Sequence, residues 1–268
     1  METNKIYNEN CLDTMAKMPD DFVDLTVTSP PYDNLRDYKG YSFDFESIAK
    51  ELYRVTRPGG VVVWVVGDMT VEGSETGTSF KQALFFKEVG FNLHDTMIYQ
   101  KESPFPSSNR YQQVFEYMFV FSKGKVKTFN PLTERKICFN RNSKSSSYRE
   151  KDGTLRKADE KQNERFKKAN EMETKMLGNV WQLNAGWMKS STDEIAFQHP
   201  ATFPEKLASN HIKSWSNEGD LVYDPFMGSG TTGKMASLLK RKYIGSEISP
   251  EYTKLAEERI NNYSNMLF

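Results

Sequence analysis

The sequence predicts an α/β protein built around a largely parallel sheet, and three observations support this fold class. Apolar runs rich in β-branched residues, such as VVVWVV at 61–66, are continuous, as in parallel strands covered on both faces. Stretches with apolar residues at helical spacing, at 45–55 and 78–89, alternate with these runs. Near each end of the chain, a strand pattern leads directly into a loop of unusual composition. Open α/β sheets bind ligands at such strand ends, so the two loops predict a ligand site.

The first loop follows a predicted strand over 24–28 and has the sequence SPPY. Proline has no amide hydrogen to donate to a sheet and fixes its own φ, so Pro30 and Pro31 must end the strand and stiffen the loop. A rigid loop of this kind would hold the Ser29 hydroxyl and the Tyr32 ring in place at the carboxyl end of the strand.

The other elements are expected in a regular succession along the chain. We predict a helix over 45–55 that RPGG stops at Pro58, a strand over 61–68, a helix over 78–89 that ends at Gly90, strands over 93–101 and 114–124, sheet-like structure again at 178–183, and helix, strand, helix, strand and helix in the last 60 residues.

The composition indicates a globular protein with one basic segment. At 268 residues and 37% hydrophobic content, the chain can fill the core of one large domain. No apolar run approaches the roughly 18 residues of a membrane helix and the N-terminal residues lack the apolar core of a signal peptide, so we expect a cytoplasmic protein without membrane contact. The net charge is zero, but residues 123–168 carry 15 basic against 6 acidic side chains, whereas residues 1–60 carry 7 against 11. The polar stretch from about 125 to 178 is therefore predicted to be an insertion that meets an anion, with a disordered surface segment as the alternative.

The cysteines and histidines predict neither a disulfide framework nor a metal site. Cys11 and Cys138 lie far apart in the sequence, and neither has metal-ligand spacing with the three histidines. We expect reduced, buried thiols, no nucleophilic cysteine and no metal.

The second loop lies near the C terminus and has the spacing of a nucleoside site. An apolar strand delivers Asp224, a loop with Gly228 and Gly230 follows, and a helix opens at Thr231. The next strand ends in Glu247, 19 positions after Gly228, where a carboxylate can bind a ribose diol. No Gly-Lys-Ser/Thr follows at the place that a Walker A loop requires, and a third glycine at the dinucleotide spacing is absent. The glycines alone are also compatible with a tight strand-to-helix turn, but the whole pattern favours a nucleoside ligand.

Three sequence motifs in this order resemble the β class of amino-group DNA methyltransferases. The motifs are TSPPY (28–32), HPATFPEKL (199–207) and DPFMGSGTTG (224–233). The resemblance implies a Rossmann-like, seven-stranded methyltransferase sheet with one antiparallel pair, in circularly permuted order and with an inserted target recognition region. It divides the chain into a catalytic half over 1–122, a target recognition insertion over 123–196 and an S-adenosylmethionine-binding half over 197–268.

The same resemblance implies roles for individual residues. The catalytic residues would be Ser29, Pro30, Pro31 and Tyr32, and the residues at the methyl donor would be Asp13, Phe203, Pro204, Lys206, Asp224, Phe226, Gly228, Gly230, Thr231, Thr232 and Glu247. Thr231 and Thr232 would cap their helix. Asp13 can instead be an ordinary acid at a helix start. His199 is expected to be a structural or capping residue rather than a base.

The resemblance also suggests the substrate. Ser before the two prolines usually accompanies N4 of cytosine in this family, and Asp or Asn usually accompanies N6 of adenine, so Ser29 favours cytosine, with adenine as the alternative. Double-stranded DNA is the expected partner, and a cognate restriction endonuclease and a homodimer stay open. Two further alternatives are a catalytically silent DNA-binding module, against which the intact motifs argue, and methylation of protein glutamine, for which the family uses Asn before the prolines.

Overall fold

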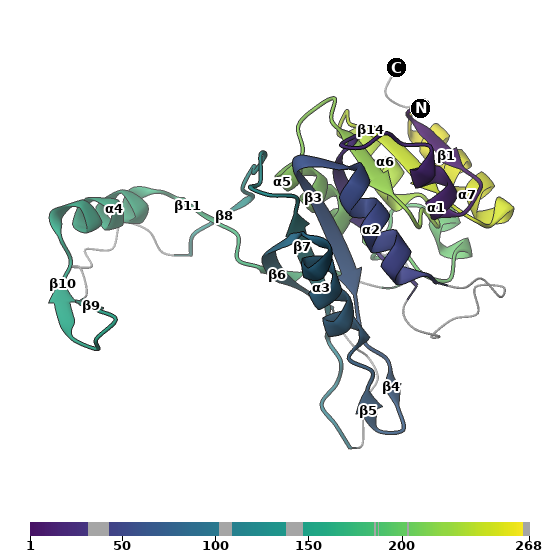
Figure 1. The fold of residues 1–268 in the computed structure, drawn as a ribbon. Helices are drawn as coiled ribbons and strands as arrows, with labels where there is room; N and C mark the ends of the chain where they lie inside the picture. The colour runs from purple at the N-terminus through teal and green to yellow at the C-terminus, as the bar shows by residue number, and fades with distance from the viewer. Residues whose placement is uncertain are drawn as a thin grey trace. The chain divides into compact units, whose positions relative to one another are not determined.

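The computed structural model describes residues 1–31, 43–101, 109–137, 147–184, 186, 188–202 and 204–264. These residues form two compact units, one made of Met1–Asn130 with Asn179–Phe268 and the other of Pro131–Gly178. The first unit contains the central sheet, and the second is a short insertion into it (Figure 1). Among the described residues, no helix is long and apolar enough to cross a membrane.

The central sheet has eight strands, and the predicted fold class is confirmed. In spatial order they are β1 (Lys5–Tyr7), β14 (Lys242–Ser246), β13 (Leu221–Asp224), β2 (Val23–Thr28), β3 (Thr56–Val66), β7 (Phe115–Ser122), β6 (Asn92–Gln100) and β12 (Val180–Gln182). All neighbours run parallel except β7, which is antiparallel to both of its neighbours. Seven strands were expected, and the eighth is β12, which pairs in parallel with β6 at the edge of the sheet.

The order of the strands shows the circular permutation directly. The N-terminal strand β1 pairs with β14, with Lys5 opposite Ile244 and Tyr7 opposite Ser246. The side chain of Asn8 then donates hydrogen bonds to the carbonyls of Glu247 (2.8 Å) and Ile248 (3.2 Å). The first residues of the chain therefore complete the half of the sheet that is otherwise built from its last residues.

Helices cover both faces of the sheet (Figure 1). One group consists of α1 (Cys11–Ala16), α2 (Phe45–Val55) and α3 (Thr78–Val89), and the other of α5 (Glu205–Trp215), α6 (Thr231–Leu238) and α7 (Pro250–Ser264). Val62, Trp64 and Val66 of β3 belong to the core cluster beneath the first group. Because side chains alternate along a strand, Val61, Val63 and Val65 are buried on the opposite face. The continuous apolar run in the sequence thus reflects burial on two sides.

The helix α2 has the predicted bounds, but β3 begins earlier than the sequence pattern suggested. The prediction started this strand at 61, after RPGG, whereas β3 begins at Thr56 and runs through RPGG. The Thr56 hydroxyl donates to the Leu52 carbonyl (2.6 Å), and Thr56 already pairs with Val23 of the sheet. Gly59, at φ +81°, keeps this irregular strand paired through its amide, which donates to the Lys123 carbonyl (2.6 Å). The remaining helices and strands that were predicted in the first unit are present.

The second unit holds small elements with little core. It contains α4 (Glu160–Glu171) and two antiparallel pairs, β8 (Thr133–Arg135) with β11 (Thr174–Met176) and β9 (Ser147–Arg149) with β10 (Leu155–Lys157). The helix buries no side chain and is closed at its start by a capping box between Asp159 and Gln162. This unit lies within the predicted insertion over 123–196 and is narrower than it. A separate hairpin in the first unit joins β4 (Thr70–Val71) to β5 (Ser74–Glu75).

Candidate active site

The two motif loops leave the sheet side by side. The strands β13 and β2 are parallel neighbours, and the chain runs outward from this pair in opposite directions, to β14 on one side and to β3 on the other. Such a switch point opens a crevice at the carboxyl ends of the strands. The Thr28 hydroxyl donates to Asp224 Oδ1 at 2.6 Å, across 196 positions of sequence. This buried hydrogen bond fixes the end of one motif strand against the other.

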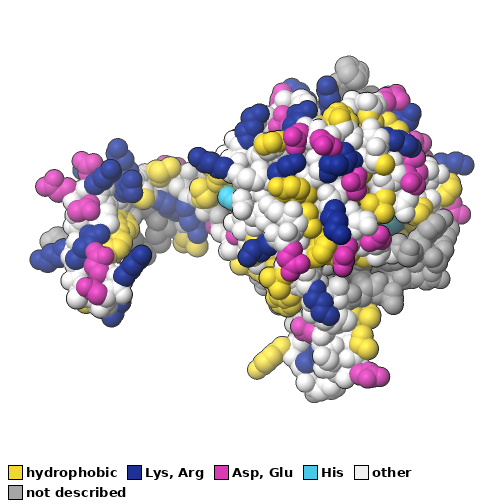
Figure 2. All heavy atoms as spheres, viewed as in Figure 1, with side chains coloured by type: hydrophobic (Ala, Val, Ile, Leu, Met, Phe, Trp, Pro, Cys, Tyr) yellow, Lys and Arg dark blue, Asp and Glu magenta, His cyan; other side chains and the backbone are white. Residues whose placement is uncertain are grey.

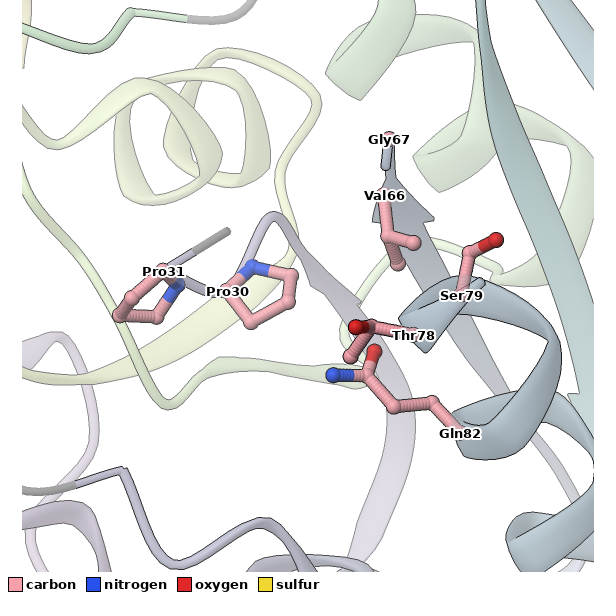
Figure 3. A pocket seen from close by; sticks show the side chains of 7 residues that line it. All are labelled: Pro30, Pro31, Val66, Gly67, Thr78, Ser79 and Gln82. Atoms are coloured by element: carbon pink, nitrogen blue, oxygen red, sulfur yellow. The ribbon is translucent and has the colours of Figure 1, made fainter. Parts of the chain in front are cut away.

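The SPPY loop begins directly after β2, as predicted. Ser29 and Pro31 are half-buried and Pro30 is buried. Pro30 and Pro31 form one wall of a small hollow whose other walls come from the end of β3 and the start of α3 (Figure 3). Tyr32, the fourth predicted catalytic residue, lies outside the described residues.

Asp224 is the most deeply buried carboxylate of the predicted donor residues, with 1% exposure. Its Oδ1 accepts hydrogen bonds from the Thr28 hydroxyl and from the amide of Phe226 (3.0 Å). Its Oδ2 has no hydrogen-bond partner within the described part of the chain. Burial raises the pKa of Asp224 to about 6 and outweighs the opposing effect of the Thr28 hydrogen bond. The enclosed carboxylate therefore fixes the loop after β13 and the end of β2 through the Phe226 amide and the Thr28 hydroxyl.

Glu247 lies against the glycine loop, as the spacing of 19 positions suggested. Its carboxylate accepts hydrogen bonds from the Gly228 amide (2.8 Å) and the Ser249 amide (2.9 Å). Burial raises the pKa of Glu247, and these amide hydrogen bonds oppose the rise. The structure thus brings Asp224, Gly228 and Glu247 together at the ends of β13 and β14.

The two glycines of the loop are needed for different reasons. Gly228, at φ +51°, lies under the His199 ring, whose nearest atoms would be 3.2 Å from a Cβ at this position. Gly230, at φ +80°, lies against α7, where a Cβ would meet the Cβ of Ala256 at 2.9 Å. Both positions combine a left-handed backbone with a close neighbour, so a residue with a side chain would be strained at either of them.

The two threonines of the motif do not cap α6, contrary to the prediction. The N-cap is Gly230, and no side chain caps the helix. The Thr231 hydroxyl instead accepts a hydrogen bond from Arg259 (2.9 Å), and the Thr232 hydroxyl donates to the Val27 carbonyl (3.1 Å). Both side chains are buried, so they turn away from the helix start and fasten it to α7 and β2.

A buried cluster of four charged side chains supports the glycine loop, and sequence reasoning missed it. Lys234 contacts the carboxylates of Asp193 (2.5 Å) and Glu205 (2.7 Å). Arg259 pairs with the same two carboxylates and also donates to the Ser229 carbonyl (2.9 Å). Burial would raise the pKa of Asp193, but hydrogen bonds from the two cations outweigh it and hold the pKa well below its usual range. A signal was available, because Lys234 lies in a helix that is otherwise built of small and apolar residues.

The remaining predicted donor residues occupy different environments. Pro204 is buried at the N-cap of α5, whereas the Lys206 side chain is exposed, and its neighbour Glu205 joins the charged cluster. Phe226 is half-buried and packs edge-on against Phe43, with ring centroids 5.7 Å apart. Phe203 lies outside the described residues.

The surroundings of Asp13 and His199 are compatible with the structural roles that the sequence analysis considered for them. Asp13 is exposed in the first turn of α1, whose N-cap is Asn10, where an ordinary helix-start acid would lie. The Nδ1 atom of His199 accepts the amide hydrogen of Ala201 (3.1 Å), and its ring packs edge-on against Tyr252 at 4.4 Å between centroids. These contacts fix the imidazole ring next to Gly228 of the glycine loop.

The described residues offer little for metal or thiolate chemistry. They contain no group of three His, Cys, Asp or Glu side chains that could hold a metal ion. Cys11 is a free, buried thiol, and burial raises its pKa to about 12, so it is not a nucleophile near neutral pH. Cys138 lies outside the described part of the chain.

Comparison with known proteins identifies the family. The family model described as DNA methylase, which unites N6 and N4 methyltransferases, matches residues 23–258. The chain belongs to this family. The match includes both motif loops and the insertion between them, so the DNA methylase family accounts for most of the chain.

Individual relatives agree with this membership. The orphan methyltransferase M.BamHII of Bacillus amyloliquefaciens is 61% identical over 242 residues, which is 90% of this chain and 89% of that protein. The type II methyltransferase M.BglII of Bacillus subtilis is 25% identical over 280 residues, 98% of this chain and 72% of the relative.

Solved structures share the fold. A protein from Thermus thermophilus described as a DNA modification methylase, in complex with S-adenosyl-L-methionine, has a TM-score of 0.65 at 24% identity, covering 96% of this chain and 93% of that one. The PvuII DNA methyltransferase, described as cytosine-N4-specific, has a TM-score of 0.66 at 22% identity and covers 97% and 90%.

Proposed function

We propose that this DNA methyltransferase transfers a methyl group from S-adenosyl-L-methionine to N4 of a cytosine that is rotated out of duplex DNA. The observation that carries the proposal is that SPPY, with Ser29 as its first residue, begins directly after Thr28, whose hydroxyl donates to Asp224 at the switch point of the sheet. The alternative target within the same family is N6 of adenine.

The residues of the donor half fit S-adenosyl-L-methionine. This compound supplies a methyl group on a positively charged sulfur, together with an ammonium, a carboxylate and a ribose diol. Asp224 would hold the end of β13 beside the donor, and the left-handed turns at Gly228 and Gly230 would bring the backbone of the loop close to it. Glu247 would bind the ribose hydroxyls, with its carboxylate already oriented by two amides. Asp13, Phe203, Pro204, Lys206, Phe226, Thr231 and Thr232 would complete the surroundings of the donor.

The SPPY loop would prepare the amine for attack. The lone pair of an exocyclic amine is delocalised into the ring, so the nitrogen is a poor nucleophile. The Ser29 hydroxyl and the Pro30 carbonyl can accept the two amine hydrogens, which favours a tetrahedral nitrogen with a localised lone pair. The ring of Tyr32 would stack on the rotated base and offset part of the few kcal/mol that unstacking costs.

Labelling the product decides between the two bases. The protein is incubated with methyl-labelled S-adenosyl-L-methionine and duplex DNA, and the DNA is digested to nucleosides. We expect labelled N4-methylcytosine nucleoside. Labelled N6-methyladenine nucleoside without the cytosine product would overturn the choice that rests on Ser29.

The second unit is proposed to be the target recognition region. Its residues 131–178 carry 13 basic and 8 acidic side chains, and Figure 2 shows Lys and Arg side chains over the segment that carries α4. Neutralising phosphates with such side chains makes affinity fall steeply with salt. Filter binding to duplex DNA at two salt concentrations tests this role, and a response that stays flat would count against it.

Partners other than DNA follow from the relatives only as proposals. The 61% identical relative is named an orphan methyltransferase and others are named type II methyltransferases, so a cognate restriction endonuclease and a homodimer stay open. Mapping methylated sites in host DNA with and without this gene would give the recognition sequence. A catalytically silent DNA-binding module or a protein-glutamine methyltransferase would leave duplex DNA unlabelled in the nucleoside assay.

A further inference from the structure

The hollow beside SPPY contains a polar side chain that neither motif includes. Its lining consists of Pro30, Pro31, Val66, Gly67, Thr78, Ser79 and Gln82 (Figure 3). Gln82 lies one turn into α3 and is 6% exposed. The start of this helix is fixed, because Asp68, two residues after β3, accepts the Ser79 amide hydrogen at 2.9 Å. Gln82 is therefore a buried group on a rigid wall opposite the prolines.

The orientation of the Gln82 amide is set by a neighbour that can only donate. Trp64 Nε1 donates to Gln82 Oε1 at 2.9 Å. The indole is fully buried in β3 and is packed edge-on by Phe86 and Phe226, so it cannot turn away. Since the indole N–H has no acceptor capacity, the amide oxygen must face Trp64 and the NH2 group must face the hollow.

The NH2 group of Gln82 has no acceptor within the described residues, and the single hydrogen bond of this side chain there is the one that its oxygen accepts. Figure 3 shows the amide nitrogen on the side of the hollow where Pro30 lies. The amide nitrogen is not among the enclosed polar atoms that lack a partner, so it opens on the hollow, where a ligand can supply the acceptor.

The bases that carry a reactive amine supply this acceptor in the right place. Cytosine has the unprotonated N3 next to its amine, and adenine has the unprotonated N1 next to its amine. Thymine and guanine carry an N–H at the equivalent ring position, beside a carbonyl. A pocket wall with acceptors for the amine and a donor for the neighbouring ring nitrogen therefore matches cytosine and adenine and disfavours thymine and guanine.

We propose that Gln82 reads the target base by donating a hydrogen bond from its NH2 group to the ring nitrogen adjacent to the amine that is methylated. This proposal rests on the proposed methyl transfer to DNA and deepens it, because it applies to cytosine and adenine alike. Ser29 and Pro30 would take the amine hydrogens while Gln82 fixes the rotation of the ring. Gln82 thus makes the pocket specific for amine-bearing bases, and Trp64 acts as a positioning residue through it.

The test removes the acceptor from the base and the donor from the protein, separately and together. Duplexes carry the mapped site with either the natural target base or its deaza analogue, which has C–H in place of the ring nitrogen: 3-deazacytosine, or 1-deazaadenine if adenine is the labelled base. Gln82→Glu keeps the acceptor for Trp64 and replaces the NH2 group by oxygen. Gln82→Met, of similar length, is the second variant, and exposed Gln112→Glu is the matched control.

The full-length protein is assayed by single-turnover methyl transfer. We expect wild type and the Gln112 variant to lose about 10- to 100-fold in rate on the deaza base. The Gln82 variants should be about 10- to 100-fold slower on the natural base and differ by less than about threefold between natural and deaza bases. A deaza penalty of equal size in wild type and in the folded Gln82 variants overturns the proposal. Failure of the proposed function looks different, because wild type would then label no base in natural DNA.

Discussion

Replacing Gly230 by alanine tests how the glycine loop is held, and the structure allows the cost to be estimated. Gly230 has φ +80°, and a left-handed backbone costs an L-residue about 1–2 kcal/mol. The new methyl group would also lie 2.9 Å from the Cβ and 3.1 Å from the Cα of Ala256, and overpacking of this kind costs about 1–3 kcal/mol. The free energy of unfolding should fall by roughly 2–5 kcal/mol in total.

Gly219 provides the matched control. It has φ +86°, and no atom lies within 4 Å of the position that its Cβ would take. Gly219→Ala should therefore show the backbone strain alone, about 1–2 kcal/mol. The difference between the two variants isolates the contact of the loop with α7.

Urea unfolding gives both free energies, and calorimetric titration gives the affinity for S-adenosyl-L-methionine. We expect Gly230→Ala to be the less stable variant by about 1–3 kcal/mol and to bind the donor at least about tenfold more weakly. Gly219→Ala should bind the donor as wild type does. Equal losses of stability in the two variants would refute the reasoning, because the contact with Ala256 would then contribute nothing.

Three further predictions follow from the site and the second unit. The folded-state pKa of Asp224 is raised to about 6 from an unfolded value near 3.9. The stability that its bound proton gives is therefore complete below pH 3.9 and is lost as the pH rises through 6. Asp224→Asn should remove this part of the pH dependence of the free energy of unfolding in urea, roughly 1–3 kcal/mol between pH 4 and 7. Glu247→Gln should weaken donor binding in calorimetry by about 10- to 100-fold, since hydrogen bonds to a charged group are removed. Changing three exposed cations of α4 to glutamine should make DNA binding less sensitive to salt in filter binding, with the slope of log affinity against log salt falling by about 0.9 for each phosphate that is no longer neutralised; these are Lys161, Arg165 and Lys168, which share a helix face.

Each of these predictions has a control and a contrary outcome. Equal pH dependence in wild type and Asp224→Asn would show that burial does not perturb this carboxyl. Glu258→Gln, exposed on α7, should leave donor binding unchanged, and an equal effect at Glu258 and Glu247 would contradict the ribose role. Changing exposed Lys50, Lys87 and Lys254 of the first unit to glutamine should leave the salt dependence as it is, and an unchanged slope in the α4 variant would place the phosphate contacts elsewhere.

The site loops could be predicted from the sequence because their chemistry is local. Pro30 and Pro31 end a strand wherever they occur, and glycines at 228 and 230 mark a strand-to-helix turn. The pattern of apolar residues likewise located the strands and helices of the first unit. Interactions within a few residues of each other determine these features, so no knowledge of the tertiary structure is required.

The contacts that assemble the site could not be predicted in this way. Arg259 and Asp193 are 66 positions apart, and a charged residue on a helix is normally expected to face solvent. Burial of Lys234 depends on carboxylates from the residue before η1 (Glu194–Gln198) and from α5, which reach it only in the folded chain. The hydrogen bond from Trp64 to Gln82 escaped notice for the same reason, because both residues occur in the sequence as parts of ordinary apolar elements. The Thr231 hydroxyl likewise does not cap α6, because in the folded chain it accepts a hydrogen bond from Arg259 of α7.

The pairing of β1 with β14 has a consequence for how the enzyme is made. During synthesis, the SPPY loop emerges early, whereas β14 and Glu247 follow only after the other strands of the central sheet. Tyr7 and Asn8 must wait for that strand, since the Glu247 amide and carbonyl are their partners. Pairing across such a long sequence separation is intrinsically slow because the loop-closure entropy must be overcome first. Any chain that stops before β14 therefore lacks both Glu247 and the strand that β1 pairs with, although its SPPY loop is already made.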